Sequence, residues 1–463
     1  MRGRLERAAR DPVLAPYRLA FSSALARRAR SDRRARRVAP SGYRRAPDTC
    51  LYPSIAVYVG SGASHSWIWF ADLLERCGLF DVDFVDETRV SGSGLERFDF
   101  LLVGGGDTYA MADSLGGRGA EAIDDFVERG GLYYGSCAGA YLVLTGVDAE
   151  PFAPFALLHG NMLNVMADPP APRCLEHKYL ARYGEEWVFH PVYGELFLEA
   201  AMEARDFPCF AAAEALAAPL LGGPVMSADD ARDVLAVFSG LSRHAAYLWP
   251  RERARALLDG RAAVCATERG EGSVMVSGPH LEHPLFPGAN ALVAEMFSRH
   301  CMRLVDNGHR PASGTTAHPD DGRAGAIPAT DTPGDSGAAL LEVKRQVSNS
   351  RIVAFGLEKI PVTWTIGLKV WEPEKVRMFL EVAWFRLPYV QAAATRVPAE
   401  PAARLAEGYS SVTEMVKSLK IKVESGEDSL ADAESLLVTL KELTASFLWL
   451  YFRLRLEDGA VQD

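Results

Sequence analysis

Cysteine is scarce in this chain and is nowhere clustered. Seven cysteines are spread over 463 residues, and no two of them form a C-x-x-C pair. A disulfide-stapled domain or a zinc site needs closely spaced pairs, so neither is expected. We therefore predict no metal site, and free thiols in a reducing, cytoplasmic compartment.

Long apolar runs and nucleotide-binding loops are also missing. No segment approaches about 18 uninterrupted apolar residues, the length that a membrane-spanning helix needs. No basic-then-apolar leader opens the chain, and no G-x-x-x-x-G-K-[ST] phosphate loop occurs. We expect no membrane span, no secretion signal and no bound cofactor.

Lysine is absent from residues 1–47, which are rich in arginine instead. Fourteen arginines against three acids give this segment a net charge of +11, and since the whole chain carries −10, the remainder carries about −21. So acidic a remainder disfavours nucleic-acid binding outside this segment. Tyr17, Phe21 and Leu25 would share one face of a helix, so residues 1–49 are predicted to be either a disordered arm or a basic helix. Two roles stay open: a solvated arm, or a contact site for RNA, an anionic membrane or an acidic partner.

Residues 50–303 show the alternation of an α/β domain. Apolar runs of strand length alternate with segments whose apolar residues recur at helical spacing. The predicted strands are 55–59, 82–85, 100–103 and 132–134, and the predicted helices are 67–77 and 120–129. Further strand-like runs lie at 187–189, 195–198, 234–238, 262–266 and 273–277, before a closing helix at 291–303. This order predicts a doubly wound parallel sheet, in which ligands bind at the carboxyl ends of the strands.

The rest of the chain divides into a linker and a tail. Residues 304–337 are rich in Gly, Pro, Ala, Thr and Asp and contain no aromatic ring of Phe, Trp or Tyr, which predicts a flexible linker. Residues 338–463 are predicted to form a mostly helical domain of unknown role. Its expected helices are 338–347, 373–384, 409–423 and 430–453, and its expected short strands are 352–355 and 362–366.

One predicted turn carries a reactive side chain. Gly135-Ser-Cys-Ala-Gly139 follows the strand at 132–134 and has the G-x-C-x-G pattern of a nucleophile elbow, a sharp strand-to-helix turn. Glycines at both ends, Gly135 and Gly139, let the strand and the helix approach closely. The thiol of Cys137 then projects above the sheet at a helix N-terminus, which favours thiolate.

A thiolate that attacks an amide needs an oxyanion site and a proton carrier. The N–H of Ala138 is predicted to point at the oxyanion, and a second N–H is expected from Gly105 or Gly106. His280 follows a predicted strand at the same end of the sheet. Glu282 lies two residues further on, where it can fix the tautomer of the ring.

These motifs resemble a known superfamily. Gly104-Gly-Gly106, Gly135-Ser-Cys-Ala-Gly139 and His280-Leu-Glu282 are similar, in order and context, to the signature of class I glutamine amidotransferases. Phe189-His-Pro-Val-Tyr-Gly194, Pro219-Leu-Leu-Gly-Gly-Pro-Val225 and Gly270-Glu-Gly-Ser-Val274 resemble the amidotransferase-like domain at the N-terminus of eukaryotic biotin–protein ligases and in free-standing microbial proteins. The resemblance implies a flavodoxin-like class I amidotransferase fold for residues 50–303.

Two departures from that pattern limit what the resemblance implies. Such families usually have Pro between the His and the Glu, whereas this chain has Leu281. The chain also lacks a Gly-Arg-Gly-Arg-type ligase motif and a lysine-bearing biotin acceptor sequence. Biotinylation is therefore not implied.

The motifs and the resemblance together predict an amidotransferase-like thiol hydrolase. Cys137 would attack the carboxamide of a small, glutamine-type substrate and form a thioester, while His280 carries the proton and Glu282 orients the ring. Since no synthetase domain is visible, an acceptor or synthetase for the ammonia would be a separate protein. Two rivals stay open: a non-catalytic binding or regulatory module, and a thiol peptidase or other acyl hydrolase. His190 either lines the same cleft or is a satisfied core or surface histidine, and Tyr141 either gates the site or only packs.

Overall fold

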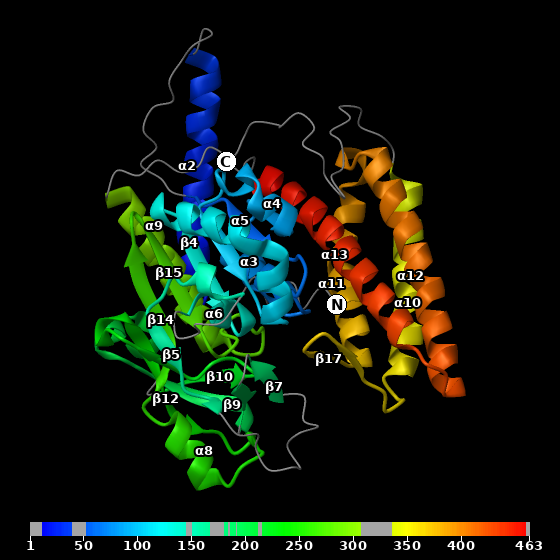
Figure 1. Cartoon of the computed structure of the whole chain (residues 1–463). Helices are drawn as coiled ribbons and strands as arrows, with labels where there is room; N and C mark the ends of the chain where they lie inside the picture. The colour runs from blue at the N-terminus through cyan, green and yellow to red at the C-terminus, as the bar shows by residue number, and fades with distance from the viewer. Residues whose placement is uncertain are drawn as a thin grey trace. The chain divides into compact units, whose positions relative to one another are not determined.

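The computed structural model describes residues 12–38, 52–144, 151–166, 180–183, 186–190, 192–211, 215–306 and 336–459 (Figure 1). They form two compact units. The first contains most of the chain before residue 315, and the second contains residues 315–458 with the short segment Phe80–Phe84. The predicted linker falls almost wholly outside the described residues, as do residues 1–11 and 39–51 of the arginine-rich segment and its flank.

A large mixed sheet organises the first unit. Its strands follow the order β10-β9-β12-β14-β15-β4-β3-β1-β2, and β5, β11 and β13 pair beside this path. The bounds are β1 (Ile55–Tyr58), β2 (Val82–Val85), β3 (Phe100–Val103), β4 (Leu132–Ser136), β5 (Gly160–Met162), β9 (Val192–Ala200), β10 (Leu216–Leu220), β11 (Met226–Ala228), β12 (Val234–Leu241), β13 (Ala246–Tyr247), β14 (Ala262–Arg269) and β15 (Gly272–Ser277). A separate three-stranded sheet contains β6 (Val165–Met166), β7 (Leu180–Tyr183) and β8 (Glu186–Phe189).

The sheet is parallel at its centre and antiparallel on one side. Strands β1, β3, β4 and β15 pair in parallel, as the α/β pattern predicts. From β15 outward, the strands β14, β12, β9 and β10 pair antiparallel, so the predicted parallel sheet ends at β15. The cause is local: β14 and β15 are joined by two residues, Gly270 and Glu271, and a connection this short can only make a hairpin. Gly270 has a φ of +56°, which glycine adopts without strain.

Helices alternate with the strands of the first unit and bury apolar side chains in its core. They are α3 (Trp67–Cys77), α4 (Glu87–Ser91), α5 (Thr108–Glu128), α6 (Ala138–Val143), α7 (Pro208–Ala211), α8 (Arg251–Leu258) and α9 (Pro287–Asp306). Helix α3 has the predicted bounds, and its inward residues Trp67 and Phe70 are fully buried. It ends at Gly78, whose left-handed conformation is typical of a helix C-cap.

The arginine-rich segment contains one long helix, α2 (Ala15–Val38), which packs on the first unit. Phe21 and Leu25 are buried, with 4% and 5% of their surfaces exposed. The hydroxyl of Tyr17 donates to Glu295 Oε2 of α9 at 2.7 Å. The face predicted from the spacing of these apolar residues is thus the face that contacts the domain.

The second unit is mostly helical, as predicted. Its elements are α10 (Gly337–Leu357), the hairpin β16 (Trp364–Ile366) and β17 (Lys369–Trp371), α11 (Pro373–Ala392), α12 (Ala399–Ser425) and α13 (Leu430–Gly459). Residues 352–355, predicted to be a strand, continue α10 instead. Ile352 and Phe355 in this run are exposed, so they do not form the buried strand that a short apolar run suggests.

Helix α13 is, within the described part of the chain, the one helix with the length and apolar composition of a membrane span. Half of its most apolar window is buried inside the protein. A buried core helix of a globular domain meets the same compositional criteria.

Candidate functional site

The strand-to-helix turn after β4 holds Cys137 in an unusual backbone conformation. Cys137 has a φ of +54° and a ψ of −108°, and among the described residues no other non-glycine has a positive φ. Strain of this kind costs on the order of 1–3 kcal/mol and clusters at functional sites. The turn is fixed by its neighbours: the Cys137 N–H donates to Ser277 O at 2.9 Å, and the Cys137 carbonyl accepts from the N–H of Ala140 and of Tyr141.

The two glycines of the turn are required by close backbone contacts. A Cβ on Gly135 would lie 2.3 Å from Gly139 O, and a Cβ on Gly139 would lie 2.3 Å from Val103 O. No side chain fits at such distances, so the missing side chain of Gly135 lets helix α6 approach β4, and that of Gly139 lets α6 approach β3. The spacing argument made from the sequence thus has a direct counterpart in the packing.

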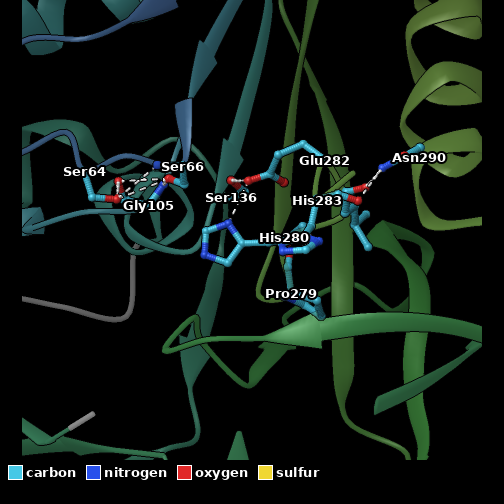
Figure 2. Close-up of polar contacts among 11 residues, drawn as sticks. Ser64, Ser66, Gly105, Ser136, Pro279, His280, Glu282, His283 and Asn290 are labelled. Carbon is cyan, nitrogen blue, oxygen red and sulfur yellow. Dashed lines mark hydrogen bonds and ion pairs between the residues drawn. The ribbon is translucent and has the colours of Figure 1, made fainter. Parts of the chain in front are cut away.

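His280 and Glu282 lie beside this turn, within the segment that follows β15 (Figure 2). Nδ1 of His280 contacts Glu282 Oε1 at 2.7 Å, and both side chains are buried, with 3% and 0% exposed. Because Nδ1 is engaged by the carboxylate, the other ring nitrogen, Nε2, is the one available to Cys137, whose side chain also hydrogen-bonds to the ring. Cys137 itself is buried, with 6% of its surface exposed.

The electrostatics of His280 favour its protonated form. Burial of the ring lowers its pKa, but the charges of Glu282 and Cys137 and the hydrogen bonds to both outweigh burial and raise the pKa of His280 from 6.5 to about 10. At neutral pH the ring therefore carries both protons and can donate from Nε2. The arrangement has the features of an activated thiol with an acid–base partner and an orienting carboxylate.

The backbone donors differ in part from the prediction. The Gly105 N–H donates to Ser66 Oγ at 2.8 Å, so it is not free to bind an oxyanion (Figure 2). Gly105 nevertheless lies against the imidazole, since a Cβ there would be 2.8 Å from His280 Cε1. The N–H groups of Gly106 and Ala138 have no acceptor among the residues that the structure describes. These two are the available donors.

Three side chains at the site were not singled out from the sequence. Ser136 donates from Oγ to Glu282 Oε1 at 2.8 Å. The ring of Trp69 meets the ring of His280 edge-on, with centroids 5.1 Å apart and an interplanar angle of 89°. Nδ2 of Asn290 donates to the carbonyls of Leu281 and of His283, at 2.6 and 3.1 Å.

Asn290 and burial together hold the turn that carries Leu281. Leu281 is fully buried, and its carbonyl is held from α9 by the Asn290 amide. The turn is therefore fixed by a side-chain bond and by burial rather than by a proline ring. Of the missed residues, Ser136 alone had a sequence signal, because it lies inside the elbow motif.

His190 and Tyr141 lie together in a buried polar cluster. The Tyr141 hydroxyl is 3.2 Å from His190 Nε2, and Asn164 Nδ2 donates to the same hydroxyl at 3.0 Å. Burial lowers the pKa of His190 from 6.5 to about 3, so its ring is neutral and Nε2 can accept from the tyrosine. Tyr141 lies one helical turn after Cys137, so the cluster adjoins the elbow.

The five cysteines that the structure describes, Cys137 among them, are all buried, and none of the five is in a disulfide. Within the described residues, no group of His, Cys, Asp and Glu side chains is arranged to hold a metal ion.

One family profile matches part of the chain. The profile of the family described as "Biotin-protein ligase, N terminal" matches residues 54–150, the segment that carries the elbow and Cys137 but not His280 and Glu282. No curated protein gives a significant match. Among solved structures, a β-galactosidase from Bacillus circulans sp. alkalophilus is similar with 12% identity and a TM-score of 0.31, covering 57% of this chain and 32% of that one. A β-galactosidase from Rahnella sp. R3 is similar with 11% identity and a TM-score of 0.29, covering 54% of this chain and 32% of that one.

The chain spans about a third of the length of these two structures, and TM-scores this low are not informative about fold or function. The relationship to the N-terminal domain of biotin–protein ligases, which the motifs of the sequence predicted, is confirmed for residues 54–150.

Proposed function

We propose that the first unit is an amidotransferase-like thiol hydrolase that acts on a small carboxamide of the glutamine type. The observation that carries the proposal is the convergence of Cys137, His280 and Glu282, which are far apart in the chain, at the ends of two adjacent parallel strands. A raised His280 pKa and a strained nucleophile backbone support a catalytic role rather than simple packing.

The first half of the reaction would form a thioester. The sulfur of Cys137 attacks the carboxamide carbon, and the carbonyl oxygen becomes an oxyanion held by the N–H groups of Gly106 and Ala138. The C–N bond then breaks, and His280 gives its Nε2 proton to the leaving nitrogen, which departs as ammonia. Glu282 holds the ring at Nδ1 throughout.

The second half would regenerate the thiol. His280, now neutral at Nε2, takes a proton from water, and the oxygen of that water attacks the thioester carbon. The C–S bond breaks, and the carboxylic acid leaves. Cys137 and His280 return to their starting charges, so the cycle consumes one water per amide.

The family relationship supports this function, and the resemblance narrows the expected substrate. The elbow lies in the segment related to biotin–protein ligase N-terminal domains, and the resemblance to class I glutamine amidotransferases favours that fold and glutamine as the substrate. We place the reaction in the cytoplasm, where the free thiols would stay reduced. The ammonia would pass to an acceptor on another protein.

A glutamine-like chloroketone tests the proposal. Intact mass should show one adduct on the wild-type chain and none on Cys137→Ala. Cys209→Ala is the matched control and should label like wild type, because Cys209 is equally buried but burial raises its pKa to about 11. Absence of an adduct on a folded wild-type protein would support a non-catalytic module instead.

Turnover separates the remaining alternatives. Ammonia release from free glutamine, abolished in Cys137→Ala, is the result expected of an amidotransferase-like enzyme. Cleavage of peptides without ammonia release from glutamine would instead support a thiol peptidase.

A further inference from the structure

Ser136 forms the link that closes a ring of contacts around the site. Its Oγ donates to Glu282 Oε1 at 2.8 Å, and that same oxygen contacts His280 Nδ1 at 2.7 Å (Figure 2). His280 in turn hydrogen-bonds to Cys137, which is joined to Ser136 by a peptide bond. The nucleophile and the anchor of the carboxylate are thus consecutive residues.

The carboxylate has few other partners. Glu282 is fully buried, and its second oxygen, Oε2, has no hydrogen-bond partner among the described residues. A buried carboxylate depends on the hydrogen bonds that it accepts, because water no longer solvates it. Ser136 therefore supplies one of the two polar contacts that the structure gives to this group.

Ser136 is well placed to set the angle of the carboxylate. It is fully buried at the end of β4 and pairs in register with Ser277 of β15, the strand that leads to His280. Ser136 is the last residue of β4, and the chain turns sharply at Cys137, so the Ser136 hydroxyl meets Glu282 while the Cys137 side chain meets the imidazole. A single hydrogen bond at this point fixes Glu282 Oε1 relative to the sheet rather than to its own loop.

We propose that Ser136 is a positioning residue: its hydroxyl holds Glu282 Oε1 so that the carboxylate keeps the His280 ring directed at Cys137. This role rests on the proposed thiol chemistry but is independent of which carboxamide is the substrate. Ser136 does not touch the reacting atoms and acts through Glu282.

Alkylation of Cys137 by iodoacetamide, followed by peptide mass spectrometry at pH 7, tests this role. Cys209, buried to a similar extent, is measured in the same sample as an internal reference for opening of the fold. We expect Ser136→Ala to slow alkylation of Cys137 about 10-fold, the effect of losing one hydrogen bond to a charged group, and to leave Cys209 unchanged. If Ser136 only stabilised the fold, its removal would instead speed alkylation of both thiols, because a looser fold exposes both.

A double-mutant cycle identifies the partner through which Ser136 acts. Glu282→Gln should slow alkylation of Cys137 at least as much as Ser136→Ala does. Adding Ser136→Ala to Glu282→Gln should then change the rate by less than about 2-fold, because residues in one network are not additive. Full additivity would overturn the proposal.

Three further variants complete the test. Ser136→Thr keeps the hydroxyl and should retain most of the rate, and Ser136→Gly removes it without adding volume and repeats the test if the alanine variant does not fold. Ser273→Ala is the matched control: Ser273 is a buried serine at the opposite end of β15, 3.2 Å from His300 Nδ1, and its loss should leave Cys137 alkylation unchanged. Since iodoacetamide does not use the substrate pocket, a failure of glutamine turnover and a failure of the Ser136 link remain separate results.

Discussion

Mild acid should destabilise the first unit through His190. Its ring is 2% exposed, and burial lowers its pKa from 6.5 to about 3. Above pH 6.5 the ring is neutral in both the folded and the unfolded chain, so it has no effect on the pH dependence of stability. Below pH 6.5 the unfolded chain binds a proton that the folded chain excludes, so the free energy of unfolding falls as the pH is lowered toward 3.

The magnitude follows from the size of the shift. One pKa unit corresponds to about 1.4 kcal/mol, so His190 should cost about 2 kcal/mol of stability at pH 5 and no more than about 5 kcal/mol at pH 3. The Tyr141 hydroxyl adds to the effect, because a protonated Nε2 could no longer accept from it. Both effects lower the free energy of unfolding as the pH falls.

Hydrogen exchange of peptides from the first unit, measured at pH 7 and pH 5 after correction for intrinsic rates, gives the change in stability. His190→Gln removes the titrating ring and keeps an acceptor near Nε2, so it should lose about 2 kcal/mol less than wild type between the two pH values. His244→Gln, at an exposed histidine, is the matched control and should behave like wild type. Equal losses in wild type and His190→Gln would refute the reasoning.

Four further substitutions, one of them a control, test packing within the first unit. Gly139→Ala should destabilise the first unit by about 1–3 kcal/mol in denaturant unfolding, because the new Cβ would overlap a backbone oxygen. Gly117→Ala is the control: no atom lies within 4 Å of its new Cβ, so this substitution should be neutral or stabilising by up to about 1 kcal/mol. Tyr17→Phe removes the hydrogen bond to α9 and should raise hydrogen exchange in α2 by an amount equivalent to about 1 kcal/mol; unchanged exchange would contradict it. Asn290→Ala removes the hydrogen bonds to the carbonyls of Leu281 and His283, in the turn after β15. It should slow Cys137 alkylation several-fold and change hydrogen exchange in α2 little.

Much of the parallel core could be predicted because local pattern and burial agree there. The strands at 55–58 and 100–103 are apolar at every position and are buried on both faces, and helix α3 has an apolar stripe between a strand and a glycine cap. The prediction of a strand at residues 352–355 was wrong for the opposite reason. An apolar run of four residues fits a strand or one turn of a helix equally well, and only the length of α10 decides between them.

Residues of the candidate site could be picked out from the sequence where a single motif contains them. Cys137 could be found because the elbow needs glycines at fixed offsets, and His280 because a strand-end histidine with a carboxylate two residues later is typical of an acid–base pair. Ser136 and Asn290 could not be assigned, because their partners are set by the register of β4 against β15 and by the docking of α9. The same limit applied to Gly105, whose N–H is taken by a serine 39 residues earlier in the chain.

The position of Cys137 is a property of the sheet rather than of its loops. The parallel ladder between β4 and β15 ends with Ser136 beside Ser277, and the Cys137 N–H extends it by one more bond to Ser277 O. A slip of one residue would turn every side chain of β4 to the other face and separate the thiol from His280, so packing of the core holds the register of the site. The polar cluster around Tyr141 adjoins the elbow but is not part of the ring of contacts around Cys137. Substitutions in this cluster should therefore change KM more than kcat, whereas substitutions in that ring of contacts should change kcat more than KM.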